Sequence, residues 1–164
     1  MADVSKGHLL QTGTGILNRD ACVVLVKTEW NAPIVDELER GCLLVFAGDI
    51  RVKTVTITVP GAVEIPFIIQ RYFREKTGNP RPDAFIALGC VVRGDTPHFE
   101  YVCESVTNGI LQLNLSLPVP VIFGVLTVNE EQQAIERIGG IHGHKGEEAA
   151  ITALKMIALN RSIN

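Results

Sequence analysis

The chain has 164 residues, a length typical of one domain, and 46% of them are apolar, so it can bury a substantial core. Its formal net charge is −3 and it contains no run of Lys or Arg, which argues against a nucleic-acid or membrane-surface partner and favours a small molecule or another protein. No apolar stretch reaches the roughly 18 residues of a membrane span, and the first residues lack the pattern of a signal peptide, so we expect a cytoplasmic protein.

Four segments rich in Val and Ile predict the strands of a sheet. Continuous apolar runs of this length suit strands that are buried on both faces. Segments of helical length alternate with them, which predicts a parallel sheet with helices on both sides, a small doubly wound α/β sandwich forming a single domain over residues 1–164. The expected strands are residues 21–28, 50–59, 84–92 and 119–128, and the expected helices are residues 32–46, 63–75, 97–117, 130–138 and 146–161.

The carboxyl ends of parallel strands meet at one edge of a sheet, where ligands of such folds bind. Trp30 follows the first strand and is either a core aromatic or a ring that stacks on a planar heterocycle, with Asn31 bonding the edge of that heterocycle. After the second strand, Gly61 and Ala62 allow the backbone to approach a ligand closely. Glu64 is either a favourable charge in the first turn of a helix or an acceptor for a polyol.

The segment RGDTPH follows the third strand and predicts a phosphate-binding corner. We expect Asp95 or Thr96 to cap the next helix and Pro97 to occupy its first position. The cap alone is a sufficient reason for these three residues. It does not explain Gly94 beside a histidine in the first turn, where free backbone N–H groups favour an anion. His98 is therefore the candidate general acid and base.

The four cysteines show no CxxC spacing and mostly lie inside apolar runs. We expect them to be buried as small hydrophobic side chains, without a disulfide framework or a zinc site. They are Cys22, Cys42, Cys90 and Cys103.

The segment GGIHGHKG near the carboxyl terminus contains two histidines without a clear third metal ligand. We expect His142 and His144 to lie in a flexible, solvated turn, and we expect no metal site. Arg137 and Lys145 flank this segment, where cations are ordinarily dipole partners or solvated surface groups and less often phosphate ligands.

Taken together, these segments closely resemble the lumazine synthase family. The resemblance extends over nearly all of the chain after about residue 20, and the first 20 residues match poorly. It implies a flavodoxin-like three-layer sandwich around a four-stranded parallel sheet. The motifs that carry it are VPGAVEIPF, ALGCVVRGDTPHFEYV, PVIFGVLTVNEEQQAIER and HKGEEAAITALKMI, in the order and spacing of the family.

The resemblance implies a transferase of riboflavin biosynthesis that uses no cofactor or metal. Such an enzyme condenses 5-amino-6-(D-ribitylamino)uracil with 3,4-dihydroxy-2-butanone 4-phosphate to give 6,7-dimethyl-8-ribityllumazine, releasing phosphate and water. It also implies a homopentamer, alone, paired as a decamer or built into a sixty-subunit icosahedral shell, with active sites between adjacent subunits. The loop from Arg137 to Lys145 lacks the insertion of several pentameric members, which favours the shell.

The resemblance further implies roles for single residues. Trp30 would stack on the pyrimidine and His98 would transfer protons. Arg137 would bind the phosphate, reaching the pocket of the neighbouring subunit together with Phe123 and Lys145. The residues implied to hold the pyrimidine and ribityl chain are Asn31, Gly61, Ala62, Val63, Glu64, Cys90, Val91 and Val92, and those implied to hold the phosphate through backbone N–H groups are Asp95 and Thr96.

The sequence departs from the commonest family pattern in three places, of which the first is its opening of about a dozen residues. Trp30 stands where phenylalanine is frequent, and the histidines of HGH stand where many members have Ala-Gly-Asn. Two other functions compete with the lumazine reaction: a related riboflavin synthase of the archaeal type, and a flavin-binding or shell protein without turnover. The RGDTPHFEYV match with its histidine argues against the first, and intact His98 and Arg137 argue against the second.

Overall fold

The computed structural model describes residues 16–163. Strands and helices alternate along most of this range, as the apolar pattern predicts. The elements are β1 (Ala21–Thr28), α1 (Ala32–Phe46), β2 (Val52–Val59), the 3-10 turn η1 (Ala62–Glu64), α2 (Ile65–Glu75), β3 (Ala84–Val92), α3 (His98–Ser116), β4 (Val121–Val128), α4 (Glu131–Ile135), β5 (Ile138–Gly140), β6 (Gly143–His144) and α5 (Lys145–Ile163).

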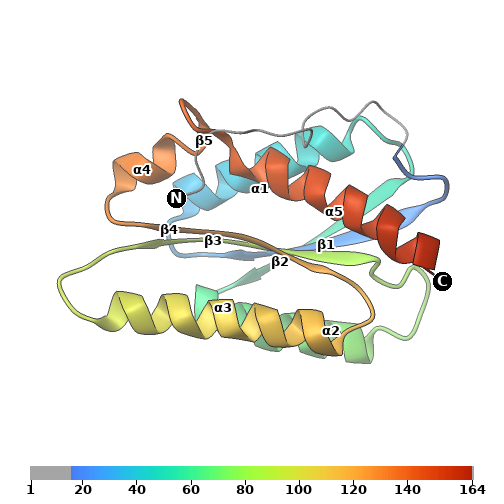
Figure 1. Ribbon diagram of the computed structural model, residues 1–164, viewed down its shortest axis with the longest axis horizontal. Coiled ribbons are helices and arrows are strands. Elements are labelled where there is room, and N and C mark those ends of the chain that lie inside the picture. Colours follow the sequence, from blue (N-terminus) through green and yellow to red (C-terminus); the bar gives the residue numbers. More distant parts are fainter. Residues whose placement is uncertain (1–15, 164) are drawn as a thin grey trace.

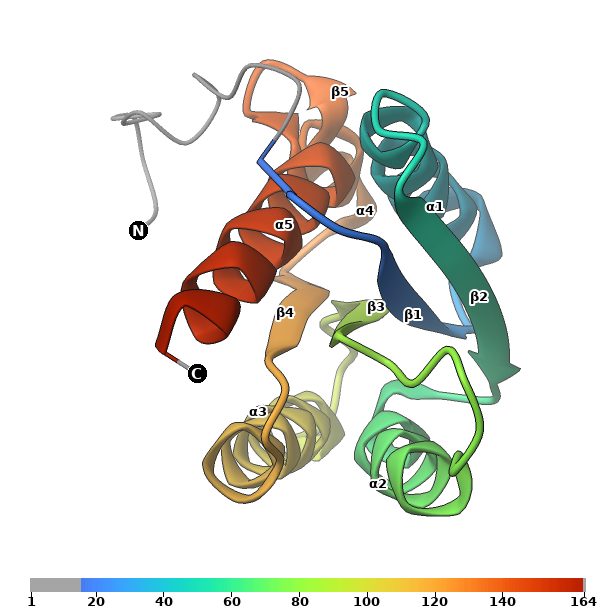
Figure 2. The same cartoon turned by 90° about the vertical axis from the view of Figure 1, so that its right-hand side faces the viewer.

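The first four strands form one parallel sheet in the order β2-β1-β3-β4. Helices α1 and α5 cover one face of this sheet, and helices α2 and α3 cover the other (Figures 1 and 2). This arrangement confirms the predicted α/β fold, a flavodoxin-like three-layer sandwich with a four-stranded parallel sheet.

Two apolar cores lie on the two faces of the sheet because successive side chains of a strand point in opposite directions. On β1, Val23 and Leu25 pack with α1 and α5, whereas Val24 and Val26 pack with α2 and α3. Strands β1 and β3 are buried on both faces along most of their length, as their continuous apolar runs predict.

The expectation of burial on both faces is wrong for β2, whose sequence VKTVTITV alternates apolar with polar residues. Strand β2 lies at the edge of the sheet, and Thr54, Thr56 and Thr58 are exposed. The Thr-rich alternation is the pattern of a strand with a solvated side, and it differs from the continuous apolar runs of β1 and β3.

The chain after β4 also differs from the prediction. Helix α4 is shorter than the expected helix of residues 130–138, and its last expected residue, Ile138, instead begins a small antiparallel hairpin of β5 and β6. Glycines at positive φ, Gly139 at 113° and Gly143 at 78°, permit the tight path of this hairpin. The hairpin places the segment after Arg137 against α1 and the start of α5.

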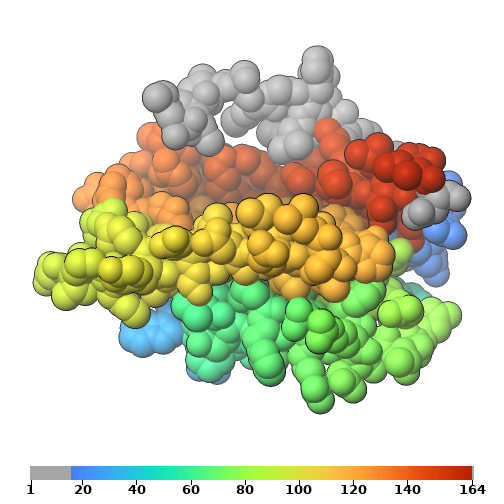
Figure 3. Space-filling view, turned by 60° about the horizontal axis from the view of Figure 1, so that its bottom comes forward, coloured from blue at the N-terminus to red at the C-terminus, as the bar shows by residue number. Residues whose placement is uncertain are grey.

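The outer surfaces of α2 and α3 carry several large apolar side chains. The two helices lie side by side (Figure 3), and Gly109 of α3 packs directly on the ring of Pro66 at the start of α2. Phe67, Tyr101 and Leu115 are nevertheless mostly exposed on them. Within residues 16–163, no helix has the length and apolar character needed to cross a membrane.

Candidate active site

The ends of β1 and β2 bring Trp30, Gly61 and Glu64 together. The N–H groups of Glu29 and Trp30 donate to the carbonyls of Val59 and Pro60, at 2.8 and 3.4 Å. A Cβ atom at Gly61 would lie 3.9 Å from Trp30 Cδ1 and 3.0 Å from Glu64 Oε2. The Trp30 side chain is 73% exposed, so it is not a core aromatic. An exposed ring and a carboxylate therefore flank a glycine at the sheet edge.

Asn31 joins this cluster to the end of β3. Its backbone is left-handed (φ 57°), a conformation that asparagine tolerates better than most residues. Its Nδ2 donates to the carbonyl of Cys90 at 2.7 Å. The Cys90 side chain is buried, and burial raises its thiol pKa to about 11, so it stays protonated at neutral pH. Val91 and Val92, which follow, are half-buried.

The 3-10 turn η1 follows Gly61 and sets the directions of its side chains. Ala62 is buried, whereas Val63 and Glu64 are exposed. The Glu64 N–H donates to the carbonyl of Gly61, which closes the turn. The turn therefore offers a carboxylate and an apolar side chain to solvent beside Trp30.

The corner after β3 is stabilised by Arg93, a residue not among those predicted for the site. Its backbone N–H donates to Val128 O at 2.9 Å, and its Nε donates to Asn129 Oδ1 at 2.9 Å. Its guanidinium pairs with Glu100 and lies 4.2 Å from the centre of the Phe99 ring. Arg93 thus connects the loops after β3 and β4 with the first turn of α3. Its place directly before the Gly-Asp-Thr turn was the signal available in the sequence.

The predicted helix cap is wrong in detail. Pro97 takes the N-cap position of α3 in a helical conformation, and neither Asp95 nor Thr96 makes a side-chain capping bond. Glu100 lies in the first turn as expected, and the guanidinium of Arg93 lowers the pKa of its carboxyl group. Asp95, Thr96 and His98 are all exposed. The amino end of α3 therefore keeps free backbone N–H groups beside an accessible imidazole.

Phe123 and Lys145 lie elsewhere in the same chain. Phe123 pairs with Ala87, and its register places it about 16 Å before the carboxyl end of β4, at about 3.3 Å per residue. With Lys145 it lines a groove of about 390 Å³ along β4 and α5. Lys145 Nζ pairs there with Glu148 at 2.8 Å. One chain does not bring Phe123 to the cluster around Trp30.

Arg137 follows α4, beyond the carboxyl end of β4, and is half-buried. Its Nη1 donates to the carbonyl of Gln133 at 2.7 Å. Its own carbonyl accepts from the Lys145 N–H at 2.8 Å, which fixes its backbone to the start of α5. The guanidinium is thus held at one nitrogen by the helix that precedes it.

The expected solvated turn at the two histidines is wrong for His144. Its side chain is buried against α1 at the base of the hairpin, whereas His142 is half-buried and lies 3.7 Å from Glu136. Among residues 16–163, no group of three or more His, Cys, Asp or Glu side chains is arranged to hold a metal ion. Cysteine burial is confirmed for Cys22, Cys42 and Cys90, and Cys103 is intermediate.

Comparison with known proteins adds an independent observation. A family model described as 6,7-dimethyl-8-ribityllumazine synthase matches residues 20–161. A protein of this name from Porphyromonas gingivalis is 47% identical over 145 residues, covering 87% of this chain and 88% of that protein. Proteins of the same name from Parabacteroides distasonis and Bacteroides fragilis are 45% identical over 135 residues and 43% identical over 142 residues. The matches cover 82% and 96% of those two proteins and 81% and 85% of this chain.

Proposed function

The chain belongs to the 6,7-dimethyl-8-ribityllumazine synthase family, a family of transferases in riboflavin biosynthesis, and from this premise we propose how its residues make the lumazine. The substrates are 5-amino-6-(D-ribitylamino)uracil and 3,4-dihydroxy-2-butanone 4-phosphate. The proposed reaction uses no cofactor or metal. We place it in one cytoplasmic domain over residues 1–164.

The observation that carries the proposed site is the cluster at the ends of β1, β2 and β3. Trp30 is exposed beside Gly61 and Glu64, where its ring has room to stack on the pyrimidine. Glu64 accepts hydrogen bonds from the ribityl chain. Asn31 holds the end of β3, and the backbone from Cys90 to Val92 lines the pyrimidine with that of Ala62 and Val63.

The phosphate binds at the start of α3. Asp95 and Thr96 contribute backbone N–H groups from the exposed turn that leads into this helix, and no side chain caps the first helical N–H groups. Arg137 supplies the positive charge, and a guanidinium suits a phosphate because it donates two parallel hydrogen bonds. Arg93 stabilises the corner without being free for the phosphate, since Glu100 already pairs with it.

The chemistry is a sequence of proton transfers around two condensations. The uracil amine attacks the ketone and water leaves, which gives an imine. A proton is then lost from carbon and phosphate departs. The enol left by this elimination takes up a proton on carbon and becomes a carbonyl, which closes on the ribityl-bearing nitrogen with loss of a second water. His98, accessible in the first turn of α3, takes up and returns these protons, a contribution of roughly 10²–10⁴-fold.

We propose that the site is completed by a second subunit. Phe123 lies in the groove of β4 and α5, too far along the strand to reach Trp30 of its own chain, and Lys145 lines the same groove. The exposed apolar side chains of α2 and α3 offer surface for association. A homopentamer, built further into an icosahedral shell, then places Phe123, Arg137 and Lys145 at the pocket of the neighbour.

The test is an assay of the purified protein with both substrates, following lumazine absorbance and fluorescence. The expected result is turnover that falls by orders of magnitude in His98→Ala at unchanged assembly, measured by sedimentation. A folded parent oligomer that binds the lumazine tightly but shows no turnover would instead make this a binding or shell protein. Conversion of added lumazine to riboflavin would favour the related synthase.

A further inference from the structure

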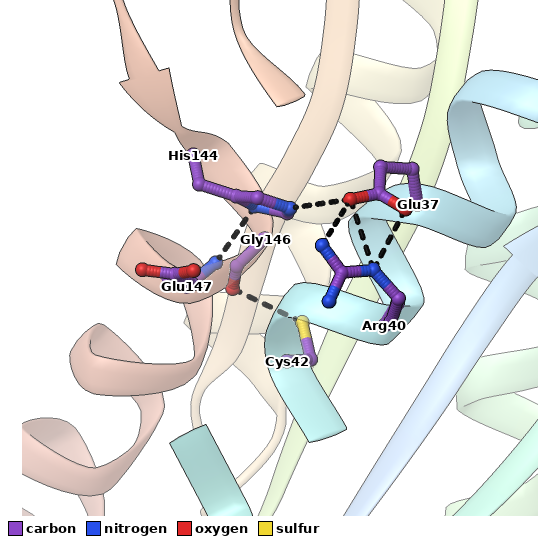
Figure 4. A network of polar contacts seen from close by, with 6 residues as sticks. All are labelled: Glu37, Arg40, Cys42, His144, Gly146 and Glu147. Carbon is purple, nitrogen blue, oxygen red and sulfur yellow. Dashed lines mark hydrogen bonds and ion pairs between the residues drawn. The ribbon is translucent and has the colours of Figure 1, made fainter. Parts of the chain in front are cut away.

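The hairpin of β5 and β6 is fixed to the body of the protein by a buried histidine. His144 is 8% exposed, and its ring lies between the amino end of α5 and helix α1 (Figure 4). The turn of the same hairpin carries His142 and Ile141, which are more accessible. The hairpin is thus held at its base and exposed at its tip.

The imidazole packs directly on the backbone of α1 at Gly41. A Cβ atom at Gly41 would lie 2.1 Å from His144 Cε1 and 2.5 Å from its Nδ1, so only glycine leaves room for the ring. Gly146, two residues after His144, packs equally closely on α1, because a Cβ atom there would lie 2.1 Å from Leu38 O. The Cys42 thiol also donates to Gly146 O at 3.1 Å.

The polar atoms of the ring have defined neighbours. Nδ1 accepts the backbone N–H of Glu147 at 3.4 Å, so the neutral ring carries its proton on Nε2. Nε2 is buried without a hydrogen-bond partner in the described residues and faces Glu37 Oε1 at 3.5 Å. Arg40 pairs with the same carboxylate and, as the larger cause, lowers its pKa, so Glu37 stays charged beside the ring.

The backbone of the hairpin connects the buried ring of His144 to Arg137. His144 pairs with Ile138 across the hairpin, and Ile138 directly follows Arg137. The adjacent Lys145 N–H donates to Arg137 O at 2.8 Å. Moving the ring of His144 therefore moves the strand and the hydrogen bond that set the backbone of Arg137.

We propose that His144 is a positioning residue for Arg137, holding its guanidinium where it meets the phosphate of the butanone substrate. The inference rests on the proposed function, in which Arg137 binds that phosphate. The buried ring acts through packing on Gly41 and through Glu37, without touching substrate. Trp30, Asn31 and Glu64 lie outside the hairpin, and Asn31, at the amino end of α1, is ten residues from Gly41, so we expect the pyrimidine site to be insensitive to the ring.

The experiment compares His144→Gln, Arg137→Ala and the double variant, with His142→Gln as a matched control on the same hairpin. The measured quantities are the KM for each substrate, kcat and the inhibition constant of inorganic phosphate. His144→Gln is expected to raise the KM for the butanone phosphate and the phosphate inhibition constant about tenfold, within the ~10²-fold cost of a misplaced group. In His144→Gln the KM for the pyrimidine should stay within about twofold of the parent. In His142→Gln all the measured constants should do so, since His142 does not hold the hairpin against α1.

The double variant shows whether His144 acts through Arg137. The expected result is a double variant no worse than Arg137→Ala alone, because the anchor has nothing left to position. Additive losses, equal losses for both substrates, or an unchanged KM in His144→Gln would each overturn the proposal. If Arg137→Ala leaves phosphate affinity unchanged, the phosphate role of Arg137 fails and the positioning role fails with it.

A substitution at Gly41, the residue of α1 on which the His144 ring packs, is a second test. Gly41→Ala puts a methyl group into the imidazole and should reproduce the selective loss of phosphate affinity. Circular dichroism and thermal unfolding of each variant verify the fold. A smaller fraction of folded protein lowers the apparent kcat of the reaction and leaves the KM of each substrate unchanged. Gly41→Ala with unchanged phosphate affinity would therefore also contradict the proposal.

Discussion

Replacing Asn31 with Asp tests the connection between the ends of β1 and β3. Aspartate has nearly the same shape and tolerates the left-handed backbone, but it cannot donate to Cys90 O, which accepts from Asn31 at 2.7 Å. Two acceptor oxygens would face each other there, and the carbonyl would lose its partner. We expect the free energy of unfolding to fall by about 1–3 kcal/mol, the usual cost of leaving such a group unsatisfied.

Urea denaturation at one fixed protein concentration measures this loss, because assembly makes apparent stability depend on concentration. Asn18→Asp, at an exposed position before β1 and away from α2 and α3, is the control for the added charge and is expected to lie within about 0.5 kcal/mol of the parent. The KM for the pyrimidine substrate should rise in Asn31→Asp alone. A variant as stable as the parent, with an unchanged KM, would refute the role given to this hydrogen bond.

Three further predictions follow from packing and charge. Gly124→Ala places a methyl group 2.8 Å from a backbone oxygen in the sheet, so the unfolding free energy should fall by about 1–3 kcal/mol; a stable variant would contradict this packing. Burial raises the pKa of all four thiols, so at pH 8 they should react slowly with a disulfide reagent, Cys103 first, and rapid labelling of Cys90 would disagree. Arginines lower the pKa of Glu37 and Glu100 in the folded state; the stability they add is present above the unfolded pKa of about 4.3 and is lost as pH falls through the lower folded values. Thermal unfolding between pH 3 and 6 should show that loss, and flat stability down to pH 3 would exclude it.

The sequence predicted the strands β1 and β3 and the helix α1 with their observed bounds, because each is a long apolar pattern with clear flanking signals. Strand β2 was predicted in place but with the wrong environment. Strand β4, at the other edge of the sheet, is mostly buried, so edge position does not decide the environment of a strand, and the Lys and Thr residues of β2 were the available signal of its solvated side.

The hairpin of β5 and β6 was missed because its strands are too short to show a period. His144 was misjudged for a related reason. A histidine beside glycines is typical of a solvated turn, and the space it fills is created by Gly41, about a hundred residues earlier in the chain. Only the fold reveals that pair.

The candidate site could be predicted as one edge of the sheet but not as a complete pocket. Trp30, Glu64 and His98 follow three strand ends, and the parallel order of the strands brings those ends to one edge. The absence of a cap from Asp95 or Thr96 could not be foreseen. Both residue types suit a cap, but the backbone conformation before α3 determines whether their side chains reach the helical N–H groups. The proposed roles of Phe123 and Arg137 depend on a second subunit, which no pattern within one chain specifies.

The most direct test of a lumazine-forming site shared between subunits is complementation of two impaired variants. His98→Ala and Arg137→Ala are each assayed alone, then unfolded together in equal amounts, refolded and assayed for lumazine formation. In a ring of head-to-tail contacts, about a quarter of the sites then combine an intact His98 with an intact Arg137 from the next subunit, and activity should return to about that share of the parent. Mixed oligomers no more active than the average of the two variants would contradict a site built from two chains.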